Sequence, residues 1–585
     1  MEKNLKVTLV ELPATVDGRL DGKLARDIYS LLMFPARGLP TLEAVLRANG
    51  YTDVVSIDPE YTHREGHLNA AQWKRLAESD VVGISAITRT ANQSYELGTR
   101  VRSINPRATI IFGGPHTTAL PEEGLQYGDL VVLHEGDYTV LEIMERLAEH
   151  RERPDWSNIL GLAYRDRDGQ LHQSPDRPFL TSEELSRLPF PVLAPEVIRG
   201  ITCHVITTSR GCPFECEFCS VIENFGKQFR FMDDDSTIEL IRHTLRYGPR
   251  KPIFFGDDIF TSNRARVKRI LSRLLSMGVR MPRWFAQVRI ESAGDKELLE
   301  LMRRTNCSTA FIGLESVNEE TLKLYKKHAT VERNRQAIEA YHAAGIKVHG
   351  MFVLGSDADT VDTVWETLAF AKRMRLDTAQ FFALTVVPGP PLTRRIYSEG
   401  RVINWGQWHL YDAQHASVQA KKISPLDLQE SVLKASLEFY SVREAFRRLL
   451  SGNHRFYNFA IRLQGKILAR RILRDNQDYI ESLRRLHTWH QQLEEESKVV
   501  IESARRRLAE LGTNLEAQRA RVQEYVSETT ERCRASIAQL PVEFGPFCRE
   551  WVDRTSAQLH KRLESALNSL EWSAPGPTTL TSEEK

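Results

Sequence analysis

The sequence lacks any apolar run long enough to cross a membrane, and it has almost no excess of charge of either sign. No stretch approaches the run of about 18 apolar residues that a spanning helix needs. The 585 residues carry 79 lysines and arginines against 77 aspartates and glutamates, a net charge of +2. This balance disfavours a protein built to bind nucleic-acid phosphates. No signal-peptide pattern opens the sequence, so we expect a cytoplasmic protein.

Cysteine is also scarce. Seven cysteines form an odd and low number for this length, which argues against a secreted disulfide scaffold. Three of them, Cys212, Cys216 and Cys219, fall within eight residues. Thiolates suit zinc or an iron–sulfur cluster. A structural zinc site normally takes four ligands, and His204 would have to supply the fourth. Three thiolates alone leave a coordination position open for chemistry.

Residues 1 to about 150 alternate apolar strands with helical segments. The expected strands are Lys6–Val10, Val54–Asp58, Val81–Ile87, Thr109–Gly113 and Leu130–His134. Buried strands separated by helices predict a doubly wound, Rossmann-like α/β domain with a parallel sheet. Such sheets bind ligands outside the carboxyl ends of their strands. The residues that we expect to form this binding rim are Ser85, Gly113, Gly114, His116, Glu135 and Gly136.

A second alternation of strands and helices covers residues 201–395, after a hairpin and proline-rich connector at residues 151–200. Six strands are expected: His204–Thr208, Pro252–Phe255, Arg283–Gln287, Thr309–Gly313, Lys347–Val353 and Thr378–Val386. Six strand–helix units predict a partial (β/α)6 TIM barrel, with its chemistry at the carboxyl ends of the strands. A C-terminal α-helical region follows. It comprises a helical extension or cap at residues 396–475, charged helices at 476–572 and a disordered tail at 573–585.

The cysteine loop has a family resemblance. The sequence Cys212-Pro-Phe-Glu-Cys216-Glu-Phe-Cys219 resembles the signature of radical S-adenosylmethionine (SAM) enzymes. The resemblance implies that the three cysteines hold a catalytic [4Fe–4S] cluster whose remaining iron is chelated by SAM. Electrons from an external reductant, such as flavodoxin or ferredoxin, then release a 5′-deoxyadenosyl radical. The residues that match the family's SAM contacts are Phe218, Asp257, Asp258, Gln287, Glu315 and Val353.

The N-terminal domain resembles the cobalamin-binding domain that precedes many radical SAM barrels. The matching segments are Phe34–Leu42, Val82–Ser85, Phe112–His116 and Glu135-Gly136. The resemblance implies that the rim residues contact cobalamin. The usual Asp-x-His-x-x-Gly loop is absent, because the segment from Glu11 to Gly18 has no histidine. We therefore expect cobalt without a histidine ligand from that loop. His116 is either a polar contact or a plain loop histidine.

Together the two resemblances imply a radical SAM enzyme that is a cobalamin-dependent methyltransferase. The expected reaction is methylation of an unactivated carbon in a small-molecule substrate, either a lipid or a natural product. The same layout serves ring-forming relatives such as the anaerobic cyclase of bacteriochlorophyll synthesis, so a radical cyclase is the alternative. A metal-binding sensor or scaffold with a helical partner surface is an alternative of another class. Such a sensor would bind metal without cleaving SAM.

Three C-terminal features have two interpretations each. Residues 455–474 carry six basic and no acidic side chains, which fits a helix on an anionic membrane surface or a basic-faced helix packed on the barrel. The charged helices after Tyr479 fit a homodimer surface or a solvated bundle. Four residues either cap the active site or pack in the core: Trp405, Trp408, His409 and Tyr411.

Overall fold

The computed structural model describes most of the chain up to residue 488. The described residues are 4–25, 34–35, 37–62, 66–150, 154–248, 251–450 and 455–488, with 491, 495 and 502. The chain divides into two units, residues 1–402 with 406–480, and residues 403–405 with 481–585. The predicted charged helices and tail lie almost wholly outside the described residues. The fold and the site below belong to the first unit.

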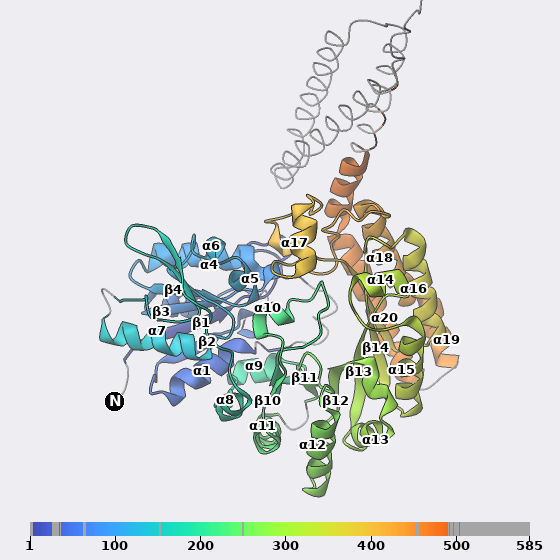
Figure 1. The fold of residues 1–585 in the computed structure, drawn as a ribbon, viewed down its shortest axis with the longest axis horizontal. Coiled ribbons are helices and arrows are strands. Elements are labelled where there is room, and N and C mark those ends of the chain that lie inside the picture. The colour runs from blue at the N-terminus through green and yellow to red at the C-terminus, as the bar shows by residue number, and fades with distance from the viewer. Residues whose placement is uncertain are drawn as a thin grey trace, which may run out of the picture. The chain divides into compact units, whose positions relative to one another are not determined.

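The N-terminal sheet has seven strands (Figure 1). In spatial order they are β2 (Val54–Ile57), β1 (Val7–Glu11), β3 (Val81–Ser85), β4 (Thr109–Gly113), β5 (Leu130–Val132), β6 (Leu162–Arg165) and β7 (Leu171–Gln173). The first five strands are parallel. Because β1 lies between β2 and β3, the strand order reverses at β1. A doubly wound sheet binds ligands at the carboxyl ends beside such a reversal.

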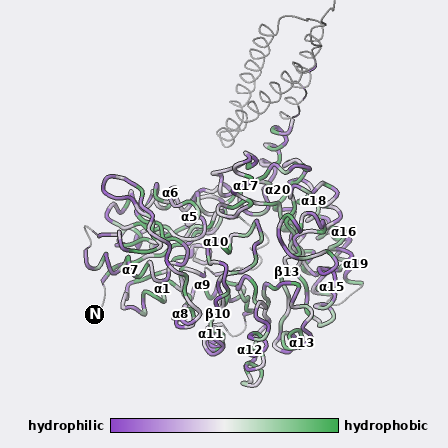
Figure 2. The backbone as a smooth tube through the Cα atoms, in the orientation of Figure 1, coloured by the Kyte–Doolittle hydropathy of each residue, from purple (hydrophilic) through white to green (hydrophobic). Residues whose placement is uncertain are grey.

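Helices cover both faces of this sheet (Figure 1). On one face α1 (Gly38–Ala48) and α7 (Asp137–Glu149) pack on a core that includes Val7 and Val132. On the other lie α3 (Ala70–Ala77) and α4 (Ala91–Ile104). The strands are apolar and largely buried, and Figure 2, which colours the backbone by the hydropathy of each residue, shows hydrophobic and hydrophilic residues mixed along the helices. Burial of both sheet faces explains why the strands read as continuous apolar runs.

The predicted hairpin extends the N-terminal sheet. Strand β6 pairs antiparallel with β5, opposing Tyr164 to Leu130, and β7 then pairs with β6. The hairpin covers the edge of β5, which would otherwise expose unpaired backbone groups. The sheet therefore continues past residue 150, where the sequence suggested that the domain ends. Two short helices, α8 (Ser182–Arg187) and α9 (Pro195–Gly200), complete the connector.

The second sheet is an open barrel of six parallel strands in sequence order. The strands are β8 (His204–Ile206), β11 (Ile253–Phe255), β12 (Trp284–Val288), β13 (Cys307–Glu315), β14 (Lys347–Leu354) and β15 (Thr378–Ala383). The helices α11 (Asp234–Tyr247), α12 (Arg264–Ser276), α13 (Lys296–Arg304), α15 (Val331–Ala343) and α16 (Val361–Arg373) alternate with them. Alternate strand residues such as Ala310, Ile312 and Leu314 pack in the core that these helices cover. The predicted α/β architecture is confirmed.

The chain continues beyond the barrel through α17 (Pro391–Ser398), α18 (Pro425–Phe439), α19 (Val442–Leu450) and α20 (Arg455–Asp475). Helix α20 contains the basic segment. Its Arg462 is fully buried, and its guanidinium donates to the carbonyls of Phe439 and Leu376. This favours the packed helix over the membrane-bound one. Within the described residues, no helix is both long and apolar enough to span a membrane.

Candidate active site

The three clustered cysteines lie in a loop that leaves the carboxyl end of β8. Before the cysteines, β9 (Ser209–Arg210) pairs with β10 (Arg230–Phe231). Gly211 has φ +83°, and a Cβ there would lie 2.2 Å from the Gln228 carbonyl oxygen, so the turn requires glycine. The amide of Cys212 donates to Gly226 O at 3.1 Å, and that of Cys219 to Cys216 O at 3.1 Å. Backbone bonds therefore shape the loop.

The three thiols are close enough to influence one another. All are free. Burial, with negative charge at Cys216 and Asp258, raises the pKa of Cys212 and raises the pKa of Cys219 to about 12. Thiolates in this place need a compensating cation. His204 lies at the opposite end of β8, where Gly248 has no room for a Cβ beside its ring. Among described residues, no three His, Cys, Asp or Glu side chains could hold one metal ion. Because His204 lies too far along the strand to act as a fourth ligand, the three thiols suit an iron–sulfur cluster better than a structural zinc ion.

Two adjacent aspartates follow β11. The Asp257 Oδ1 atom accepts hydrogen bonds from Thr208 N at 2.9 Å, from Thr208 Oγ1 at 3.1 Å and from Ser209 Oγ. Asp257 thus fixes the start of the cysteine loop, while its buried Oδ2 has no hydrogen-bond partner in the described structure. Burial raises the pKa of Asp258 to about 6, against the lowering effect of Arg37.

Arg37 links the two sheets. This N-terminal-domain residue donates from Nη1 to the Gly256 carbonyl, beyond β11 of the barrel, at 2.7 Å. Burial raises the pKa of Glu11, while Arg37 and a hydrogen bond with Ser85 lower it. Glu11 and Ser85 are paired residues at the carboxyl ends of β1 and β3. The reversal point of the first sheet therefore lies near the strand ends of the barrel.

Glu315 ends β13 in an ion pair that sequence reasoning missed. Its Oε1 atom lies 2.6 Å from Lys327 Nζ, and the two side chains are 8% and 13% exposed. Burial lowers the pKa of Lys327, but Glu315 and Cys216 outweigh it and raise the pKa. Gly313 leaves room for the pair, because a Cβ there would lie 2.4 Å from Glu315 Oε1. The basic run after α14 (Glu319–Leu324) was the available signal for Lys327.

The segment after α14 also holds the cysteine loop. The Phe218 ring meets the Tyr325 ring edge to face, with centroids 5.0 Å apart. Glu217 donates from its amide to Tyr325 O at 3.2 Å, and its carboxylate pairs with Lys326 and Arg395. Phe218 thus has a packing role in this structure.

Gln287 and Val353 lie near the carboxyl ends of β12 and β14, which are separated by β13. The Gln287 carbonyl, on β12, accepts from Phe260 N at 2.9 Å. Val353 is half-buried near the end of β14. Nearby, Phe254, Phe285 and Phe311 from three successive strands form a ring cluster with centroids 5.3–5.8 Å apart. Phe34 of the N-terminal domain joins it, 5.0 Å from Phe254.

At the N-terminal rim, two predicted residues are enclosed by protein. Gly114 has φ +100°, and a Cβ there would lie 2.7 Å from the Ala86 carbonyl oxygen. The fully buried His116 ring meets the Trp408 ring edge to face at 4.8 Å. Trp408 and Tyr411 are themselves buried, which favours core packing over an active-site cap. Gly113 is not crowded, since an added Cβ would make only ordinary contacts with Val132, the nearest at 3.8 Å.

Glu135 of the N-terminal domain forms ion pairs with two arginines of the barrel domain. Its Oε2 atom lies 2.8 Å from Arg230 Nη1 and accepts from Leu180 N at 2.8 Å. Its Oε1 atom lies 3.3 Å from Arg210 Nη1. Gly136 directly precedes α7. Both oxygens of Glu135 therefore lie within ion-pair distance of an arginine, although Oε1 makes no hydrogen bond in the described structure, and the sequence suggested neither pair.

Comparison with known proteins matches both halves of this arrangement. The radical SAM superfamily model matches residues 206–371, and the B12-binding domain model matches residues 30–144. An uncharacterized methyltransferase of Pyrococcus horikoshii is 30% identical over 371 residues, which cover 62% of this chain and 79% of that protein. The chain belongs to the cobalamin-binding radical SAM family. The predicted family is confirmed.

Other relatives and solved structures match the chain at lower identity. Bacteriochlorophyllide d C-12(1)-methyltransferase of Chlorobaculum tepidum is 26% identical over 373 residues, 63% of this chain and 76% of that one. Among solved structures, OxsB with aqua-cobalamin and SAM matches with a TM-score of 0.60 at 16% identity, over 97% of this chain and 81% of that one. TsrM from Kitasatospora setae matches with a TM-score of 0.55 at 18% identity, over 68% and 78%. These structures support the fold.

The cofactors predicted for a radical SAM enzyme of this kind, a [4Fe–4S] cluster, SAM and cobalamin, are confirmed at family level. The chain's own residues fit them. Cys212, Cys216 and Cys219 form a thiol set suited to an iron–sulfur cluster. The unpartnered Asp257 Oδ2 is a buried acceptor at the adjacent strand end. Gly113, at the end of β4, carries no side chain and is not crowded by protein atoms, the nearest lying 3.8 Å from an added Cβ.

Proposed function

We propose that this radical SAM enzyme is a cobalamin-dependent methyltransferase acting on an unactivated carbon of a lipid or natural-product substrate. The observation that carries the proposal is Arg37, which joins the reversal point of the B12-binding sheet to the end of β11. When bound, SAM at the cluster supplies a carbon-centred radical and cobalamin supplies a methyl group. Holding the two cofactors beside one substrate is the protein's main contribution.

Each group of residues has a role in this proposal. Cys212, Cys216 and Cys219 hold the cluster, and Asp257 fixes the start of their loop through Thr208 and Ser209. Glu315 is oriented by Lys327 at the end of β13. The ring cluster around Phe254 provides apolar surface near the strand ends, which supports an apolar substrate. An external reductant delivers the electrons.

The relatives support methylation over cyclisation. The P. horikoshii and C. tepidum relatives at 30% and 26% identity carry methyltransferase names. The anaerobic magnesium-protoporphyrin IX monomethyl ester cyclases of Rubrivivax gelatinosus and Cereibacter sphaeroides are 24% and 23% identical. A hopanoid C-2 methylase of Rhodopseudomonas palustris, at 24%, supports a lipid as one substrate class.

Anaerobic reconstitution tests the proposal. The protein is loaded with iron, sulfide and cobalamin and given SAM with a reductant. We expect about four irons per chain, bound cobalamin, and release of both 5′-deoxyadenosine and S-adenosylhomocysteine. Cys216→Ala should abolish 5′-deoxyadenosine release. Cys203→Ala is the matched control, because Cys203 is a buried free thiol outside the cysteine loop.

The outcomes separate the alternatives. Metal binding without SAM cleavage would favour the sensor. A chain that never retains cobalamin would contradict the methyltransferase. Release of 5′-deoxyadenosine without S-adenosylhomocysteine would favour the cyclase.

A further inference from the structure

The loop after β5 contacts both ends of the cysteine loop. Arg210, two residues before Cys212, makes a bidentate ion pair with Asp137. Its Nη1 donates to Oδ2 at 2.7 Å and its Nη2 donates to Oδ1 at 3.2 Å. On the far side of the cysteines, the Glu223 carbonyl lies 2.8 Å from His134 Nδ1. The protein thus anchors the cysteine loop at both ends on one segment of the N-terminal sheet, residues 134–137.

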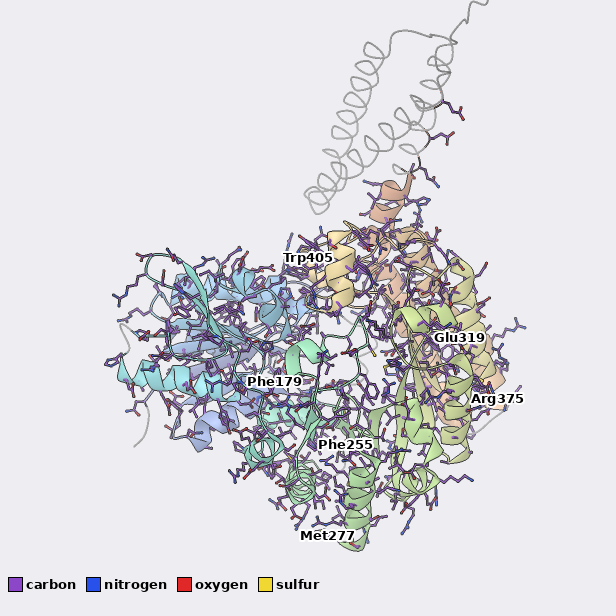
Figure 3. All side chains as sticks on the ribbon, in the orientation of Figure 1. Phe179, Phe255, Met277, Glu319, Arg375 and Trp405 are labelled. Carbon is purple, nitrogen blue, oxygen red and sulfur yellow. The ribbon has the colours of Figure 1, made fainter. Side chains whose placement is uncertain are left out.

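Glu135 extends this contact into a four-residue network. It pairs with Arg230 at 2.8 Å and with Arg210 at 3.3 Å. Arg230 faces Arg210 across the β9–β10 pair. The Arg230 guanidinium also lies 4.9 Å from the centre of the Phe179 ring, which Figure 3 labels beside these elements. Two carboxylates therefore balance two guanidiniums.

The four side chains of this network are largely buried, so each charge needs an oppositely charged partner at a suitable distance. The side chains of Arg210, Arg230, Glu135 and Asp137 are 16%, 9%, 6% and 5% exposed. Burial lowers the pKa of Arg210, but Asp137 and Glu135 outweigh it and raise the pKa. Buried charges are tolerated only when each keeps well-placed partners. The network consequently fixes where residues 134–137 lie relative to Arg210.

The same segment adjoins the rim of the B12-binding sheet. Strand β5 pairs with β4, which ends at Gly113. Residues 134–137 thus follow the strand next to the one that ends at Gly113. A ligand that changes the position of these strand ends changes the anchor of the cysteine loop as well.

We infer that residues 134–137 and Arg210 form a positioning element that couples cobalamin binding at the sheet edge to the geometry of the cluster. Arg210 is the positioning residue. This inference rests on the cluster and cobalamin of the proposed function, but not on methyl transfer. Coupling between two binding sites is reciprocal, so each ligand changes the affinity for the other by the same factor.

The test measures that linkage in the full chain. Cobalamin affinity is determined by absorbance titration for the cluster-loaded and the cluster-free protein, and the EPR spectrum of the reduced cluster is recorded with and without cobalamin. In the wild type we expect the cluster to change the affinity and cobalamin to change the spectrum. In Arg210→Gln both differences should be lost, while iron and cobalamin still bind.

Three further variants keep the test decisive. Arg210→Lys should restore part of the coupling, because it keeps the charge facing Asp137. Asp137→Asn removes the same ion pair with little change of shape, and should uncouple the sites if Arg210→Gln fails to fold. Lys227→Gln is the matched control, because it breaks only the exposed pair with Glu215.

The inference and the proposed function fail in different ways. A wild type that retains no cobalamin contradicts both, whereas a wild type that shows the coupling but releases no S-adenosylhomocysteine contradicts only the proposed function. A wild type that binds both groups with no mutual effect overturns the inference. Unchanged coupling and spectra in both Arg210→Gln and Asp137→Asn overturn it too.

Discussion

The Arg289 guanidinium lies 3.7 Å from the centre of the Phe214 ring, inside the cysteine loop. From the same side chain, Nη2 donates to the Lys327 carbonyl at 3.1 Å and Nε donates to Glu291 at 3.1 Å. Arg289 follows β12, and Lys327 lies beyond β13. The Arg289 side chain therefore connects the cysteine loop to the segments that follow β12 and β13.

We expect Arg289→Met to reduce the iron content of the reconstituted protein without unfolding it. A buried cation over an aromatic ring contributes about 1–2 kcal/mol, and its loss frees Phe214. Arg289→Lys should not restore iron fully, since lysine lacks the planar group that stacks on a ring. Iron per chain and the thermal unfolding midpoint are the measurements. Arg333→Gln is the control, because Arg333 approaches the same Glu291 from the exposed side at 3.7 Å. Full iron loading of Arg289→Met would contradict this role.

The Glu315–Lys327 pair should behave as a buried ion pair. Glu315→Gln or Lys327→Met alone leaves one buried charge without its partner, which typically costs about 3–5 kcal/mol. The double variant should recover much of that loss, since neither charge remains. Urea unfolding followed by tryptophan fluorescence measures the three variants. Additive losses in the double variant would show that the two side chains do not act together.

The arrangement of strands was predictable because it depends on local pattern. The expected strands lie within a few residues of β1–β5 and of the barrel strands, and the cysteine loop was recognisable by its resemblance to the radical SAM signature, including Phe218 before the third cysteine. The partners of site residues were not predictable. Arg230 is 95 residues from Glu135, and Lys327 is 12 residues from Glu315 across a loop and a helix. A rim residue that binds a ligand and one that binds another part of the chain look the same in sequence.

Asp258 should make stability depend on pH in the cluster-free protein. Burial raises its pKa to about 6, so the folded state favours the protonated carboxyl. The charged form costs stability above that pH, and the cost is relieved as the pH falls toward the ordinary value near 4. Asp258→Asn should therefore stabilise the protein by about 1–2 kcal/mol near pH 7.5 and by little near pH 4.5.

Asp257 provides the contrast. Asp257→Ala removes the acceptor for Thr208 N and the two hydroxyl groups, so it should destabilise the protein over the whole pH range. Urea unfolding at a series of pH values measures both variants. A stabilisation by Asp258→Asn that does not change with pH would contradict this account.

Alanine substitutions at two neighbouring glycines should distinguish an effect on protein stability from an effect on cobalamin binding at the rim of the B12-binding sheet. At Gly114, the positive φ and the Ala86 carbonyl at 2.7 Å leave no place for a Cβ. Gly114→Ala should therefore lower the unfolding midpoint, because both the backbone conformation and the contact must change. At Gly113 an added Cβ makes only ordinary contacts, the nearest at 3.8 Å. Gly113→Ala should leave stability almost unchanged.

Cobalamin titration measures the second effect, for which Gly113→Ala is the informative variant. If cobalamin approaches the backbone at Gly113, where a Cβ is absent, Gly113→Ala should weaken cobalamin binding severalfold while the apoprotein unfolds like the wild type. Gly169→Ala is the control for a glycine in a turn, because Gly169 has φ +76° and no atom near its Cβ position, and it lies in the β6–β7 hairpin. Wild-type cobalamin affinity in Gly113→Ala would show that the cofactor does not approach the end of β4. The contact would then have to be sought at Glu11 and Ser85, where the strand order reverses.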